Sequence, residues 1–241
     1  MTVKPLNERQ LFRMKRKNLE KRINQYYLET QDIETVLDYS LAVLVFNGIT
    51  MDNYSFVCKE LIKEIFLTSE PSDKLRDYCL YFYDFFEYEE WETVRKRLFK
   101  SRAAFSEHTR GIRPETKFVR AESAPTIMKK EWLHEHYLDD KVEKDRYDYY
   151  YEAIFKDEQG KKHKQKFQNA DISMPSNRLS TLLTILTRLT IFEKNGIRRF
   201  YEVVHSECQT VISHTFYGDK DEDAAFLQRR REEEAAQRDS L

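Results

Sequence analysis

Glycine is scarce in this sequence, and its scarcity excludes several large classes of enzyme. Only five glycines occur in 241 residues, and no two of them lie close enough together to build a phosphate-binding loop. The nucleotide-binding patterns G-x-x-x-x-G-K-[ST] and G-x-G-x-x-G are both missing, and they need glycine because only glycine lets the backbone approach a phosphate closely. The G-x-S-x-G elbow of serine hydrolases is missing for the same reason.

Cysteines and long apolar runs are also few. The three cysteines, Cys58, Cys79 and Cys208, lie far apart without a C-x-x-C pair, so we expect buried free thiols rather than a zinc or redox site. The longest apolar stretch, Leu41 to Phe46, is much shorter than the roughly 18 residues that span a bilayer. The first residues lack the apolar segment of a secretory signal. These absences predict a cytoplasmic protein without a cofactor or a membrane partner.

Large apolar side chains are abundant. Hydrophobic residues make up 40% of the chain and aromatic residues 14%, which is too many for a disordered protein. The length suits one large domain or two small ones, and we expect the α+β class, with an N-terminal helical bundle followed by a mixed antiparallel-sheet and helix C-terminal half. The predicted units are a helical domain at 1–104, a linker or crossover at 105–125, an α+β domain at 126–218 and a polar charged tail at 219–241.

Apolar residues recur at helical spacing through the N-terminal half. The pattern predicts helices at Asn7 to Leu28, from Thr30 or Asp32 to Phe46, from Thr50 or Asp52 to Phe66, and from Asp73 to about Lys100. Asn47-Gly48 is expected to close the second helix. The fourth is aromatic on nearly every side, so it must be wrapped by other helices or used against a partner. A central helix of the bundle is the favoured interpretation, and Tyr81, Phe85 and Tyr88 are the candidate partner-binding residues.

The C-terminal half alternates strand-like and helix-like segments. Periodicity is lost from Ser101 to Pro125, which indicates a crossover, and the segments beyond it predict a β-β-α-β-β order behind a leading helix. The predicted elements begin with a helix at Thr126 to Leu138, a strand at Tyr147 to Phe155 and a second strand that ends near Phe167. A helix at Ser176 to Phe192, a turn at Asn195-Gly196, and an antiparallel pair of strands at Ile197 to Val204 and Cys208 to Tyr217 follow.

Histidines and carboxylates gather in one short segment near the start of the C-terminal half, but their spacing does not suit a metal ion. His134 and His136 face different directions on a helix, whereas chelation there needs a spacing of four residues. A strand would place them on one face, but Glu135 stands where strand motifs of this kind carry an apolar residue. We therefore expect no metal and keep His134 and His136 as weak candidates. Two [DE]-x-K matches, Glu115-Thr116-Lys117 and Asp139-Asp140-Lys141, leave a metal-dependent hydrolase or nuclease as an alternative.

Positive charge is concentrated at the N-terminus. Eight cations and two carboxylates lie between Met1 and Ile23, a local charge of +6 in a chain whose total is −1. Such a segment, together with the basic crossover, is able to contact phosphates, and a solvated helix face is the alternative. The candidate nucleic-acid-binding residues are Arg9, Arg13, Arg16, Lys17, Lys21, Arg22, Arg110 and Arg113.

These observations favour a non-catalytic accessory or regulatory protein that binds a macromolecule. Nucleic acid is slightly favoured over a protein partner, because the positive charge is so unevenly placed. The first alternative is a protein-protein interaction module that forms a homodimer or binds another protein through its aromatic segment. The second is the metal-dependent hydrolase or nuclease.

Overall fold

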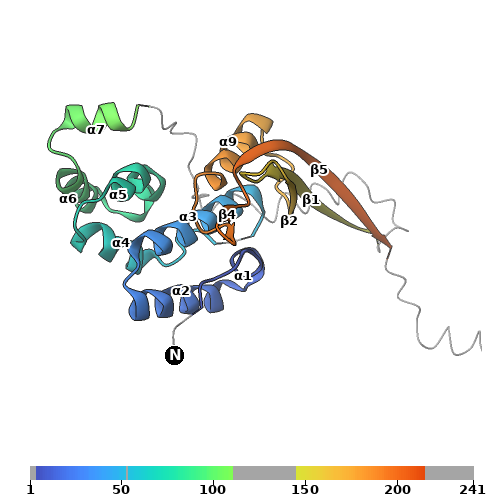
Figure 1. Cartoon of the computed structure of the whole chain (residues 1–241), viewed down its shortest axis with the longest axis horizontal. Helices are drawn as coiled ribbons and strands as arrows, with labels where there is room; N and C mark the ends of the chain where they lie inside the picture. Colours follow the sequence, from blue (N-terminus) through green and yellow to red (C-terminus); the bar gives the residue numbers. More distant parts are fainter. Residues whose placement is uncertain (1–3, 53, 111–144, 215–241) are drawn as a thin grey trace, which may run out of the picture.

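A computed structural model describes residues 4–52, 54–110 and 145–214 of the chain (Figure 1). The predicted α+β class is confirmed, because helices fill the N-terminal half and an antiparallel sheet with one helix fills most of the rest. None of the described helices is long and apolar enough to cross a membrane. In chain order the elements are α1 (Glu8–Arg13), α2 (Arg16–Thr30), α3 (Ile33–Ile49), α4 (Lys59–Thr68), α5 (Asp73–Tyr78), the 3-10 helix η1 (Cys79–Phe85), α6 (Tyr88–Leu98), α7 (Arg102–His108), β1 (Asp145–Lys156), β2 (Lys162–Gln168), α9 (Ser176–Leu186), β3 (Glu193–Lys194), β4 (Ile197–Arg198) and β5 (Glu202–His214).

The predicted first helix is in fact two helices, α1 and α2. Met14 has extended backbone angles and ends α1, and its carbonyl accepts a hydrogen bond of 2.8 Å from the Tyr54 hydroxyl. Phe12, at the end of α1, packs against Phe167 of β2 and against Phe192, each with a ring separation of 5.7 Å. The break turns α1 toward the sheet, so it brings the basic N-terminal residues next to the C-terminal half.

α3 crosses the middle of the molecule and is buried along most of its length (Figure 1). Of the two predicted caps, Thr30 and Asp32, it is Asp32 that caps the helix, and its carboxylate accepts the Thr35 amide proton at 3.1 Å. The predicted stop at Asn47-Gly48 is wrong, because the helix continues to Ile49. The Asn47 side-chain oxygen accepts the Tyr54 amide proton at 2.7 Å, so this residue orders the following loop from within the helix.

The third predicted helix begins later than its sequence pattern indicates. α4 starts at Lys59 instead of at Thr50 or Asp52. Phe56 and Cys58 have positive φ angles of 55° and 52°, in the left-handed region that a right-handed helix excludes.

The predicted long helix from Asp73 to Lys100 is three elements, α5, η1 and α6. Phe86 has extended backbone angles and separates η1 from α6. The tighter winding of η1 distributes its rings among different neighbours: Phe82 packs on Phe66 at 5.7 Å and Phe85 on Phe56 at 5.4 Å. The change from an α-helix to a 3-10 helix thus lets this aromatic segment bury rings against several neighbouring elements.

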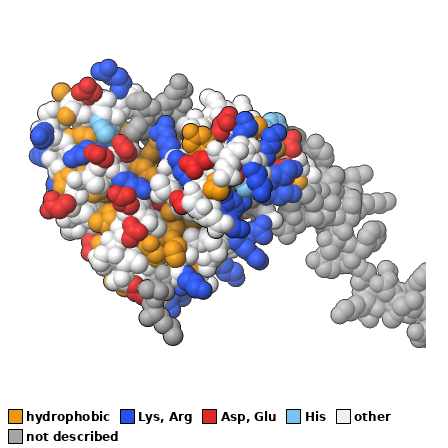
Figure 2. Space-filling view, in the orientation of Figure 1, with side chains coloured by type: hydrophobic (Ala, Val, Ile, Leu, Met, Phe, Trp, Pro, Cys, Tyr) orange, Lys and Arg blue, Asp and Glu red, His pale blue; other side chains and the backbone are white. Residues whose placement is uncertain are grey.

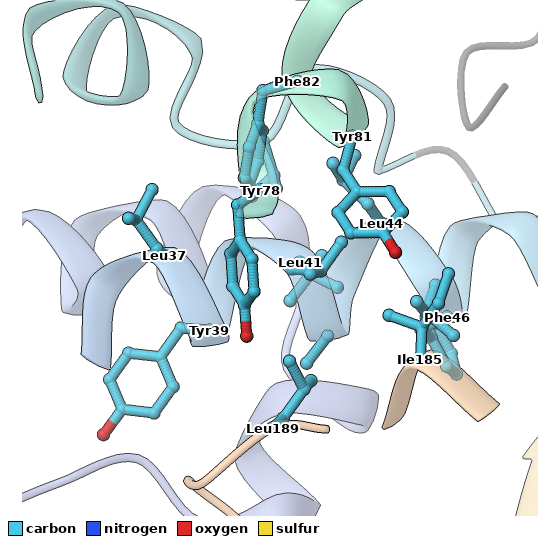
Figure 3. Close-up of a cluster of buried hydrophobic side chains, with 14 of the residues drawn as sticks. Leu37, Tyr39, Leu41, Leu44, Phe46, Tyr78, Tyr81, Phe82, Ile185 and Leu189 are labelled. Atoms are coloured by element: carbon cyan, nitrogen blue, oxygen red, sulfur yellow. The ribbon is translucent and has the colours of Figure 1, made fainter. Parts of the chain in front are cut away.

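The two halves of the chain share one hydrophobic core. Figure 3 shows Leu41 of α3, Tyr78 of α5 and Leu189, which follows α9, lying close together, and all three side chains are buried. α9 packs on α3 and also contacts β5. The helical half therefore forms one face of the core and the sheet with α9 forms the other. The domain boundary at 105–125 stays a prediction.

β1 is the central strand of a three-stranded antiparallel sheet with the order β2-β1-β5. The predicted hairpin of β1 and β2 is confirmed, and Tyr151 pairs with Phe167 in it. Tyr151, Ala153 and Phe155 alternate along β1 and are buried, because successive side chains of a strand point to opposite faces. One face of the sheet thus closes the core, and the other carries charged residues such as Lys164 and Glu152, which pair at 2.6 Å.

The second predicted strand pair is wrong. β5 is one continuous strand that pairs with the whole of β1, and it contains no glycine, proline or asparagine to form a tight turn. The Asn195-Gly196 turn is present, but it joins the short strands β3 and β4. α9 also ends at Leu186, before the predicted Phe192.

The predicted crossover begins with a helix. α7 lies inside the segment from Ser101 to Pro125, and the Ser101 hydroxyl caps it by accepting the Ala104 amide proton at 3.1 Å. The helix predicted at Thr126 to Leu138 and the tail at 219–241 lie outside the described residues.

Candidate functional site

Two hairpin turns form the walls of a cavity at the end of the sheet. The β1–β2 turn contains Gly160 (φ 82°), and the β3–β4 turn is formed by Asn195 (φ 55°) and Gly196 (φ 74°). A two-residue type I′ hairpin turn requires a positive φ at both of its central residues, and asparagine followed by glycine is a favoured sequence for it. The backbones of Glu158 and Arg198 hold the two turns together, because the Glu158 amide donates to the Arg198 carbonyl at 3.3 Å.

The cavity has a volume of about 470 Å³ and is lined mainly by charged and polar side chains. The charged lining residues are Asp157 and Lys161 of the first turn, His163 of β2, Lys194 of β3, and Arg199, which follows β4. The described lining contains no serine, threonine or cysteine, so it offers no hydroxyl or thiol nucleophile. Its converging cations are able to bind an anion.

Asp157 organises the first turn. One oxygen of its carboxylate accepts the amide protons of Gln159 at 3.0 Å and Lys161 at 2.8 Å, and the other lies 2.7 Å from Nε2 of His163. The hydrogen bond to His163 is the main cause that lowers the pKa of Asp157, and the two backbone amides act in the same direction. Asp157 thus stays ionised and fixes both the turn and the imidazole.

Glu8 connects the cavity to α1. Its carboxylate lies 2.6 Å from the Arg199 guanidinium, and burial raises the pKa of Glu8 although Arg199 and His163 oppose this shift. Glu8 is placed by the cap of α1, in which the side chains of Asn7 and Gln10 bond each other's backbone amides at 3.0 Å. The beginning of α1 therefore lies at the edge of the cavity.

Two lysines of the cavity form no ion pair within the described part of the chain. Arg199 is paired with Glu8, and His163 is held by Asp157. Lys161 and Lys194 are exposed, and neither forms an ion pair with any residue in the described part of the chain. Their ammonium groups are available to a ligand.

The predicted basic residues of the N-terminus lie on α1 and α2. Figure 2 shows Lys and Arg side chains gathering over the sheet and toward α1. Arg9 and Arg13 of α1 and Lys17 and Lys21 of α2 are exposed, whereas Arg16 is half-buried and pairs with Glu20 at 3.1 Å. Arg22 is also half-buried.

The crossover cations are not all brought to this surface. Arg110 is exposed just after α7, and Figure 1 places α7 at the upper left, well separated from α1. Arg113 lies outside the described residues. The cavity cations Lys161, Lys194 and Arg199 were not among the predicted residues, because they are far apart in sequence and only the two turns bring them together.

The predicted partner-binding residues differ in exposure. Tyr81 and Phe85 are buried in the chain's own core, with 9% and 1% of their surface exposed, whereas Tyr88 is 72% exposed. Phe85 packs on Phe56 and Phe82. Of these three side chains, a partner at the surface has direct access to Tyr88.

The predicted metal candidates His134 and His136, and both [DE]-x-K matches, lie outside the described residues. Within residues 4–52, 54–110 and 145–214, no three histidine, cysteine or acidic side chains are grouped closely enough to hold a metal ion.

A second polar cluster lies inside the core, around Asp38 of α3. The fully buried Asp38 carboxylate accepts hydrogen bonds from the Tyr78 hydroxyl at 2.7 Å and from the Thr190 amide and hydroxyl at 2.9 and 2.8 Å, and it pairs with Lys74 at 2.8 Å. Burial, followed by the Asp38 charge, raises the pKa of Tyr78, so the Tyr78 hydroxyl remains a donor. The cluster ties α3 and α5 to the segment after α9.

No family model, no curated protein and no solved structure matches this chain.

Proposed function

We propose that this chain is a non-catalytic protein that binds nucleic acid, with the cavity and α1 contacting the phosphate backbone. The observation that carries the proposal is the convergence of Lys161, Lys194 and Arg199 on one cavity whose edge is formed by the basic helix α1. Phosphates are the anions for which a surface of this type, with exposed cations on neighbouring elements, is suited.

The spacing of charges supports a polyanion over a small acid. Arg9 and Arg13 are exposed on α1, and Glu8 of the same helix contacts Arg199 in the cavity wall. A ligand that fills the cavity and continues over α1 would meet cations at both places. Each phosphate contact releases condensed counterions, so binding of this kind weakens as salt rises.

The alternative of self-association through the aromatic segment has less support. Phe85 and Tyr81 are occupied by contacts within the chain, so among the three predicted residues only Tyr88 offers a ring to a partner.

The test is fluorescence anisotropy with single-stranded and duplex oligonucleotides at several salt concentrations. Wild-type protein should bind in the micromolar range or tighter at low salt. The logarithm of the binding constant should fall linearly with the logarithm of the salt concentration, with a slope of about −0.7 to −0.9 for each phosphate contacted. The variant Lys161→Ala/Lys194→Ala should bind more weakly and with a shallower salt dependence.

The matched control is Lys96→Ala/Lys100→Ala, which removes the same charge from exposed positions at α6, away from the sheet in Figure 1. An equal loss of binding in both double variants would show that only net charge matters and would contradict the proposed site. No binding to any oligonucleotide at low salt would overturn the function itself.

A further inference from the structure

We propose that the cavity binds a terminal phosphate monoester of a nucleic-acid strand, at its 5′ or 3′ end. The inference rests on the proposed function and assigns a specific chemical group to the same site. A monoester differs from the internal phosphodiesters of the strand in carrying a second ionisation and a third free oxygen.

The size of the site and the convergence of its cations suit a compact terminal group. Cations from three separate segments, at residues 161–163, 194 and 199, converge on one cavity of about 470 Å³. This volume lies within the roughly 300–1,000 Å³ of small-molecule pockets. A strand that continued past this point would have to enter and leave the cavity, whereas a strand end enters once. Cations that tracked a continuous backbone would instead be spread along a groove.

With His163 protonated, the net charge of the site matches a doubly charged group. Lys161, Lys194 and Arg199 face the two acids Asp157 and Glu8, so the cations exceed the acids by one with His163 neutral and by two with His163 protonated. The excess resides in the two unpaired lysines. A phosphate monoester carries about −1.5 to −2 at pH 7, and a phosphodiester carries a single charge.

The two paired bases are held in position by their acids. Asp157 holds Nε2 of His163 at 2.7 Å, and Glu8 holds one guanidinium nitrogen of Arg199 at 2.6 Å. A guanidinium has five N–H donors, so Arg199 retains donors for a phosphate oxygen while it is bonded to Glu8. The lysines then supply charge, and Arg199 supplies directed hydrogen bonds.

The experiment compares three oligonucleotides of one sequence with an internal fluorophore: a 5′-phosphate form, a 3′-phosphate form, and a form with hydroxyls at both ends. Wild-type protein should bind one of the phosphorylated forms about tenfold more tightly than the hydroxyl form, because charge-assisted hydrogen bonds to the terminal group are added. The end that gives the preference identifies the source of the monoester.

Two variants separate the cavity from the general basic surface. Lys161→Ala/Lys194→Ala should lose the preference, so that all three oligonucleotides bind with equal affinity. Lys162→Ala, which removes an exposed charge next to Lys161 but outside the cavity lining, should keep it. Inorganic phosphate at constant ionic strength should also abolish the preference in wild-type protein.

The two proposals fail in different ways. Equal affinity of wild-type protein for all three oligonucleotides would overturn the assignment of a terminal phosphate while leaving nucleic-acid binding intact. A preference that survives in Lys161→Ala/Lys194→Ala would place the phosphate elsewhere and overturn the inference as well. Absence of binding to every oligonucleotide would overturn the proposed function and this inference together.

Discussion

Asp38 and Asp157 are the central carboxylates of two polar clusters that are built alike but differ in whether their cations are paired. Both carboxylates are buried, and both accept hydrogen bonds from more than one segment of the chain. Around Asp38 the cation Lys74 is engaged by the carboxylate at 2.8 Å, so the cluster is closed. Around Asp157 the turns also carry Lys161 and Lys194, whose ammonium groups form no ion pair with any described residue. A closed cluster can only stabilise the fold, whereas an open one retains charge for a ligand.

The largest expected effect is on stability at the closed cluster. Asp38→Ala should lower the free energy of unfolding by about 3–5 kcal/mol, because it leaves Lys74 without its counter-charge and the Thr190 groups without their acceptor inside the core. Urea denaturation followed by circular dichroism measures this. Asp38→Asn, which keeps an acceptor oxygen, should lose less. A loss below about 1 kcal/mol for the alanine variant would show that the cluster does not hold the two halves together.

A smaller effect is expected at the turn that carries Lys194. Gly196 has φ 74°, and a Cβ atom there would meet nothing within 4 Å. Gly196→Ala should therefore destabilise only through backbone strain, by about 1 kcal/mol. Thermal unfolding measures the change, with Lys194→Ala as a control that leaves the turn unstrained. Unchanged stability in Gly196→Ala would mean that the turn relaxes without strain.

The open cluster should also make stability depend on pH. The pKa of Asp157 lies below its ordinary value of 3.8 in the folded protein. The ionised carboxylate therefore stabilises the fold above about pH 3.8, and this contribution is lost as the pH falls through the lower folded pKa. Asp157→Asn should flatten the acid limb of the stability curve, measured by urea denaturation between pH 2 and pH 6. An unchanged acid limb would contradict the role given to the His163 contact.

Elements with a regular local pattern could be predicted from the sequence. The β1–β2 hairpin and α3 follow from strand alternation and helical spacing, and Asp32 was one of the two caps expected for α3. The breaks were missed where tertiary contacts override local pattern. Met14 ends α1 so that Phe12 reaches the sheet, and η1 changes pitch to distribute its rings.

The candidate site was predicted only in part. Runs of cations in α1 and α2 are visible in the sequence, and four of them, Arg9, Arg13, Lys17 and Lys21, are exposed. Lys161, Lys194 and Arg199 are separated by up to 38 residues, and no local pattern relates them. Gly160 and Asn195-Gly196 mark the two turns in the sequence, but their proximity depends on the backbone bond between Glu158 and Arg198.

The difference between the two clusters can be measured directly by nuclear magnetic resonance of the backbone amides during titration with a 5′- or 3′-phosphorylated oligonucleotide. The Gln159 and Lys161 amides donate to Asp157, and the Thr190 amide donates to Asp38, so each cluster carries its own probe. We expect saturable shifts at Gln159 and Lys161 and an unmoved Thr190 signal. Shifts at Thr190 without shifts at Gln159 and Lys161, or no shift at any of the three, would contradict the assignment of the cavity as the binding site.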